Sequence, residues 1–232
     1  MKRRLVGICF PLAFLLLLSS SAFADTVNIA TAPTGNDSVN WAQLGAAPST
    51  VCSISATSVD GLGVTSPQGV EIFAESSTSL PWTGNFSPGE NVIYTETAST
   101  LTLNFSQGVS EVGAQIEPDF YGDFTGQIQV YDGSTLLGTF IENGVSTYND
   151  DGSAIFLGAD DLTGADITSV VFSTGGSASG FAIGTLNLGD SVSTVATPEP
   201  SSLLLLGIGL LGLVGLAAFR RQLGWQSIVT EP

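Results

Sequence analysis

Short runs in which apolar and polar residues alternate fill the middle of this chain. Residues 101–105 and 112–116 alternate with a period of two, which places every second side chain on the same face of a strand. Asp132-Gly133 separates two further runs, and this dipeptide between alternating segments favours a tight β-hairpin. Because no helical repeat is visible in residues 25–197, the pattern predicts an all-β domain, a β-sandwich of jelly-roll-like form.

Other strands and turns follow from the same signals. Residues 25–67 are less patterned, and we expect them to complete the sandwich with a strand at 28–30 and a loop at 46–50. Turn-forming clusters occupy residues 149–152 and 173–180. Further strands are expected at residues 70–73, 92–95, 154–157, 167–172 and 181–188.

The charges are segregated along the chain, whose formal net charge is −16. All five basic residues lie near the two ends, whereas 19 of the 21 acidic residues lie in residues 25–197, which contain no Lys, Arg or His. Such a domain repels phosphate backbones, so nucleic acid is excluded as a partner. Because most catalytic templates also need Lys, Arg or His, and no other catalytic motif occurs, we expect no enzymatic activity.

The N-terminus has the layout of a signal peptide. A basic start at residues 2–4 precedes an apolar run at residues 5–18, and the small residues Ala22 and Ala24 follow. The apolar run is short and contains a proline, which disfavours a transmembrane helix. We therefore expect signal peptidase to cleave after Ala24, so that the mature chain begins at Asp25.

The C-terminus combines a short motif, an apolar segment and a basic end. Pro198-Glu199-Pro200 precedes residues 201–219, which are uncharged and span about 28 Å as a helix, close to the thickness of a bilayer core of about 30 Å. The two prolines keep the tripeptide extended. Arg220 and Arg221 would stop transfer through the inner membrane and leave the acidic domain outside.

This arrangement of Pro198-Glu199-Pro200, apolar helix and basic pair resembles the PEP-CTERM sorting signal. The resemblance implies that an exosortase-type membrane protease recognises the tripeptide and processes the anchor, in a Gram-negative bacterium that makes exopolysaccharide. Segments of this type also go by the label ice-binding protein C-terminal domain, which implies no affinity for ice in the attached domain. The tail after Arg221 is longer than is usual in that family.

Taken together, these features predict export across the inner membrane, transient anchoring there by a single C-terminal span, and a final place on the cell surface or outside the cell. The expected segments are a signal peptide at 1–24, a β-sandwich domain at 25–190, a linker with the tripeptide at 191–200, a transmembrane sorting helix at 201–219 and a basic cytoplasmic tail at 220–232.

Two sets of residues in the domain could bind a ligand. The acidic pairs Asp150-Asp151 and Asp160-Asp161 lie in turn-like sequence and could hold calcium, although solvated turn aspartates are the alternative. Trp82 and Tyr121 lie in loop-like sequence and could stack on sugar rings, whereas the phenylalanines, Phe156 among them, are expected in the core. Cys52, the cysteine of the domain, is expected to be a small buried apolar residue.

Two functions remain open at this point. The first is a non-enzymatic surface or matrix protein that is sorted by its anchor and associated with exopolysaccharide. The second is a carbohydrate-binding jelly-roll module, with calcium as a conceivable cofactor.

Replacing Glu199 with Ala tests the sorting motif. Export and folding should be unaffected, whereas the unprocessed, membrane-embedded form should accumulate, as seen by fractionation and immunoblotting in a host that carries the protease. Deleting residues 201–232 should instead release the domain without the sorting step. Trimming and release of the Glu199→Ala protein at the wild-type level would show that the tripeptide is not the signal.

Overall fold

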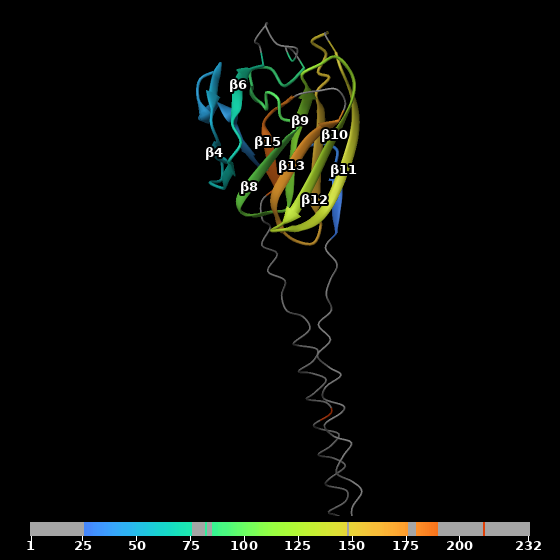
Figure 1. Ribbon diagram of the computed structural model, residues 1–232. Coiled ribbons are helices and arrows are strands. Elements are labelled where there is room, and N and C mark those ends of the chain that lie inside the picture. Colours follow the sequence, from blue (N-terminus) through green and yellow to red (C-terminus); the bar gives the residue numbers. More distant parts are fainter. Residues whose placement is uncertain are drawn as a thin grey trace, which may run out of the picture. The chain divides into compact units, whose positions relative to one another are not determined.

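Two β-sheets form the domain in a computed structural model that describes residues 26–75, 82, 85–147, 149–175, 180–189 and 211. The first, sheet A, runs in the order β1-β12-β9-β14-β7-β6-β3, and β15 pairs with both β2 and β9. The second, sheet B, runs in the order β11-β10-β13-β8-β5-β4, and Figure 1 shows β8, β13, β10 and β11 side by side. The two sheets confirm the predicted all-β sandwich.

The strands of sheet A are β1 (Val27–Ala30), β2 (Asp37–Val39), β3 (Ser49–Val51), β6 (Val70–Ala74), β7 (Asn91–Tyr94), β9 (Glu111–Pro118), β12 (Ile155–Asp161), β14 (Phe181–Ile183) and β15 (Leu186–Gly189). Those of sheet B are β4 (Ile54–Thr57), β5 (Gly63–Ser66), β8 (Thr100–Val109), β10 (Gly122–Asp132), β11 (Thr135–Ser146) and β13 (Ile167–Gly175). A short 3-10 helix spans Trp41–Leu44.

The hairpin between β10 and β11 forms where Asp132-Gly133 predicts it. Asp132 pairs with Thr135 across the turn, and Gly133 has φ of 54°, a left-handed conformation that glycine adopts without strain. Along β10 the side chains alternate between the core and the outer face, in agreement with the period-two pattern. The hairpin therefore forms at the predicted turn, and its register shifts by one residue between Val130 and Tyr131.

Two expectations about the strands are wrong. Residues 25–67 complete the sandwich and β1 covers the expected strand at 28–30, but β3 begins inside the expected loop at 46–50, and four strands and the 3-10 helix were not expected there. These strands are only three or four residues long, too short for alternation to be visible. The expected strand at 181–188 is divided into β14 and β15, because Gly184 and Thr185 leave the ladder to meet other partners.

The main core lies between the sheets and consists of apolar side chains that face inward from both. Trp41 is fully buried, and its indole Nε1–H donates to the carbonyl oxygen of Gly184 at 2.6 Å. A second, smaller cluster covers part of the outer face of sheet A and includes Trp82, Phe86 and Val92. The loop that precedes β7 is therefore fixed against sheet A from outside.

The expected segments at both ends of the chain lie outside the described residues, apart from Leu211 in the expected sorting helix. This holds for residues 1–24, for Asp25, for the linker with Pro198, Glu199 and Pro200, and for Arg220 and Arg221. Within the part of the chain that the structure describes, no helix has the length and apolar character needed to cross a membrane.

Replacing Trp41 with Ala should lower the free energy of unfolding by about 3–5 kcal/mol, because the change leaves a large cavity and an unpaired carbonyl at Gly184. Leu162, whose side chain is 63% exposed, provides the control, and its replacement by Ala should change stability by no more than about 0.5 kcal/mol. Urea unfolding of both variants and of the wild type measures these changes. If the Trp41→Ala and Leu162→Ala proteins were equally stable, Trp41 would not be a main contributor to the stability of the core.

Candidate functional site

A groove of about 550 Å³ crosses the outer face of sheet A. One side is formed by residues 31–33, which follow β1, and the other by Ser87 and Glu90, which precede β7. The floor comes from β12, β9 and the segment that ends in β15. The lining residues are Thr31, Ala32, Pro33, Ser87, Glu90, Gln115, Phe156, Thr185 and Asn187.

The alternation of β9 and β12 places the floor residues outward. Ala114, Ile116 and Leu157 are fully buried in the core between the sheets. Gln115 and Phe156, their neighbours in sequence, pair across the two strands on the opposite face and are only half-buried. The groove is thus built on the back of the main core.

The Phe156 ring lies directly over two glycines of the sheet. A Cβ atom on Gly113 would come within 2.4 Å of the ring, and one on Gly158 within 2.9 Å. Gly113 and Gly158 are themselves paired across β9 and β12, so together they form a flat, bare patch of backbone. This patch holds the ring against the sheet, and the half-buried side chain still borders the groove.

Two amide side chains lie beside the ring with fixed orientations. The Gln115 amide donates from Nε2 to the carbonyl oxygen of Ala154 at 3.2 Å. The Asn187 amide donates from Nδ2 to the carbonyl of Thr185 at 3.1 Å and to that of Gly113 at 3.5 Å. Because a carbonyl can only accept, these contacts fix which end of each amide is the NH₂ group.

Glu90 contributes a carboxylate to the wall of the groove. Its Oε1 accepts the backbone N–H of Thr185 at 3.0 Å, and Gly184 leaves room for it, since a Cβ there would lie 2.2 Å from Oε1. Burial raises the pKa of Glu90 above its ordinary value, although hydrogen bonds from Thr185 and Ser87 partly oppose this. Chemically, Glu90 is an acceptor for hydroxyl or ammonium donors.

A second carboxylate, Glu117, lies further along the same face of β9 but is completely buried. Its Oε1 accepts from the Asn85 amide at 3.1 Å and from the Ser153 hydroxyl at 2.9 Å. Burial raises the pKa of Glu117, and the hydrogen bonds from Ser146, Ser153 and Asn85 lower it by less. Glu117 therefore connects the segment that contains Asn85 with the segment that contains Ser153, and it does not line the groove.

The two acidic pairs proposed for calcium do not come together. Asp150 and Asp151 precede β12, whereas Asp160 and Asp161 end it, so the length of a seven-residue strand separates them. The carboxylate of Asp161 accepts three backbone N–H groups of the turn at 163–166, so its oxygens hold this turn. Among the described residues, no group of three or more acidic or cysteine side chains is placed to hold a metal ion.

Trp82 is not an exposed platform, which corrects the prediction from its loop-like sequence. Its side chain is 1% exposed, its Nε1–H donates to the carbonyl of Pro118 at 3.2 Å, and its ring packs against Tyr94 with centroids 4.8 Å apart. The apolar cluster outside sheet A requires a large side chain here, so burial overrides the loop context.

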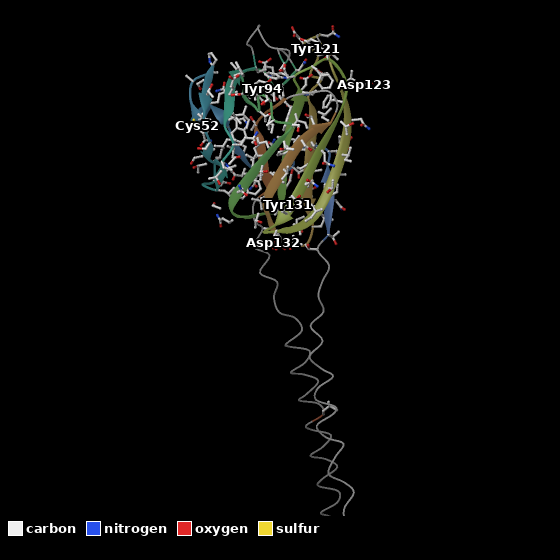
Figure 2. The ribbon with its side chains drawn as sticks, in the orientation of Figure 1. Cys52, Tyr94, Tyr121, Asp123, Tyr131 and Asp132 are labelled. Atoms are coloured by element: carbon white, nitrogen blue, oxygen red, sulfur yellow. The ribbon has the colours of Figure 1, made fainter. Side chains whose placement is uncertain are left out.

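Tyr121 is 45% exposed, at the end of the sandwich that also carries Asp123 (Figure 2). It does not line the groove.

Cys52 is exposed, contrary to expectation, because it follows the edge strand β3 in a bend (Figure 2). Sequence reasoning also missed Phe156, and the signal that could have found it is the pair of glycines, Gly113 and Gly158, in otherwise regular strands.

Replacing Glu117 with Gln tests the cost of the buried charge. Burial raises the pKa of Glu117 in the folded protein above the ordinary value of 4.5 that it has in the unfolded chain. The free energy of unfolding is therefore highest below the unfolded pKa, where the carboxyl is protonated in both states, and it falls as pH rises through the folded pKa. The Gln variant should therefore be more stable than wild type at about pH 7 and show a smaller loss of melting temperature between about pH 4.5 and pH 7. Asp132→Asn, which removes one exposed charge, is the control, and identical pH profiles of the Gln variant and wild type would contradict the assignment.

Comparison with known proteins adds a finding from outside the groove. A search of curated proteins gives no match to this sequence. A crystal structure of a DUF4465 family protein from Bacteroides caccae is similar at 13% identity and a TM-score of 0.38, over 72% of this chain and 94% of that one. Residues 196–222 match the family model of the PEP-CTERM protein-sorting motif, which implies export, a C-terminal membrane-anchoring sorting signal and processing by exosortase at the membrane. The chain therefore carries a PEP-CTERM sorting motif behind an all-β domain and is a protein sorted to the cell surface or the extracellular space.

Proposed function

We propose that the β-sandwich binds glycan chains through the groove on sheet A, and that it does so without turning them over, at the cell surface or in the exopolysaccharide around the cell. The proposal joins the two functions that the sequence leaves open. A surface protein that is retained among polysaccharide needs a site for sugars, and the groove has the chemistry of such a site.

The observation that carries the proposal is the position of Phe156. One face of the ring rests on Gly113 and Gly158, and the half-buried side chain borders the groove between residues 31–33 on one side and the polar Ser87 and Glu90 on the other. Sugar rings have apolar C–H faces that pack on aromatic rings, and hydroxyls around their edges that need hydrogen-bond partners. Gln115, Asn187 and Glu90 supply such partners beside the ring, which is the combination that ligand sites of this size use.

The acidic residues of the groove support binding without catalysis. Glycoside hydrolysis generally requires two carboxyl groups on either side of the scissile bond. Glu90 is the one acidic residue among those that line the groove, and Glu117 is completely buried beneath neighbouring loops. Binding without hydrolysis also suits a protein that remains in a matrix.

Replacing Phe156 with Ala should weaken binding to polysaccharide at least about tenfold, which corresponds to about 1.4 kcal/mol and to the scale of one aromatic stacking contact. Co-sedimentation of the full-length chain in non-ionic detergent, with insoluble polysaccharides and with the host's own matrix, measures this. Circular dichroism and melting temperature confirm that the variant is folded.

Leu162→Ala is the matched control, because it removes an exposed apolar side chain just beyond β12 and should leave binding unchanged. Tyr121→Ala tests the alternative site, in which sugar rings stack on Tyr121 at the end of the sandwich. If Tyr121→Ala abolished binding and Phe156→Ala did not, the groove would not be the site.

A further inference from the structure

We infer that the groove selects a glycan rich in hydrogen-bond donors and free of anionic groups, so that neutral or amine-bearing chains bind and chains carrying carboxylate, sulfate or phosphate are rejected. The inference rests on the proposed function and adds the class of glycan to it. It follows from which hydrogen-bonding groups face the groove and from the charges around them.

Three of the four amide N–H groups of Asn187 and Gln115 are directed at backbone carbonyls of the protein. Asn187 directs Nδ2 at two backbone carbonyls, those of Thr185 and Gly113, which accounts for both of its N–H groups. Gln115 directs Nε2 at the carbonyl of Ala154. An incoming anion, which can only accept hydrogen bonds, therefore finds few N–H donors at the floor of the groove.

Acceptors are more abundant. The Glu90 carboxylate borders the groove, where it accepts the Thr185 N–H and hydrogen bonds from Ser87. A carboxylate accepts and does not donate while it is ionised, so it pairs with sugar hydroxyls or with an ammonium group. The other polar lining groups are hydroxyls, which donate or accept as the ligand requires.

The surrounding charges have a single sign. Glu111 and Glu117 lie on the same face of β9 as Gln115, about 13 Å and about 7 Å along the strand in opposite directions. Asp160 occupies the same face of β12, beyond Gly158. No Lys, Arg or His occurs in residues 25–197 to offset them. The shorter of the two separations is within the screening length of about 8 Å at physiological salt, and both are shorter than the screening length of about 30 Å at 0.01 M salt. An anionic polymer therefore meets like charge at the Glu90 wall and along β9 and β12.

A matched set of polysaccharides tests the inference. The host's matrix polysaccharide is separated by anion exchange into neutral and acidic fractions, and part of the neutral fraction is carboxymethylated or aminoethylated. Binding of the full-length chain in non-ionic detergent is measured with and without Phe156→Ala. The neutral and aminoethylated forms should bind in a Phe156-dependent manner, and carboxymethylation should weaken binding at least about tenfold at low salt, with partial recovery as salt screens the charges.

Glu90→Gln separates the charge from the shape of the groove. Glutamine keeps an oxygen for the Thr185 N–H but accepts hydrogen bonds from sugar hydroxyls more weakly, so affinity for the neutral fraction should fall. The ratio of neutral to carboxymethylated binding should nevertheless fall several-fold, because the negative charge is gone. Asp132→Asn, the control, removes one exposed charge from the β10–β11 hairpin and should leave the ratio of neutral to carboxymethylated binding unchanged.

The remaining outcomes count against the inference. Phe156-dependent binding of the acidic fraction that equals binding of the neutral one would overturn it while leaving the glycan-binding function intact. The same holds if chelation of divalent cations abolishes binding, because a cation would then be bridging anionic sugars to the protein. If no fraction binds in a Phe156-dependent manner, the proposed function fails and the inference fails with it.

Discussion

The carboxylates of this domain have no cation to pair with, because residues 25–197 contain no Lys, Arg or His. Each one that is buried must be accommodated by neutral donors. Asp161 accepts three backbone N–H groups of a turn, and Asp37 accepts those of Ser38 and Asp60. Glu111 holds the segment after β1 through the backbone N–H and hydroxyl of Thr34. The acidic side chains thus serve as anchors for loops, and charge-assisted hydrogen bonds replace the ion pairs of an ordinary domain.

This constraint also shapes the outer face of sheet A. Glu90 and Glu117 are directed toward backbone and amide donors, and both carry raised pKa values because burial outweighs those hydrogen bonds. Glycines make the arrangement possible, since a side chain at Gly184 would collide with Glu90 and one at Gly113 with Phe156. The groove is therefore the space left between loops that carboxylates hold in position, and its floor belongs to strands whose other face packs in the main core.

Much of the fold could be predicted from the sequence, and the reason is visible strand by strand. The long strands β8, β10 and β13 have enough residues for alternation to identify them, and Asp132-Gly133 marks the hairpin between β10 and β11. Strands of three or four residues, such as β2 and β4, carry too little pattern. Which side chains border the groove could not be foreseen, because it depends on what covers sheet A from outside. Trp82 was expected to be exposed, but the cluster outside sheet A buries it. Phe156 was expected in the core, but it lies on the outer face of sheet A and borders the groove.

The groove draws its residues from five separate parts of the chain, and β15 is the last strand to be made. In the same sheet, β1 pairs with β12 and β2 pairs with β15, so these two N-terminal strands complete their hydrogen bonds only with strands from late in the chain. Such distant pairings slow folding, since the chain must close long loops before it gains the contacts. In a chain exported N-terminus first, β1 has no partner until β12 has emerged, and β2 has none until β15 has emerged. Asn187 arrives at the very end of this process, so the groove is completed only on a domain that has fully crossed the membrane.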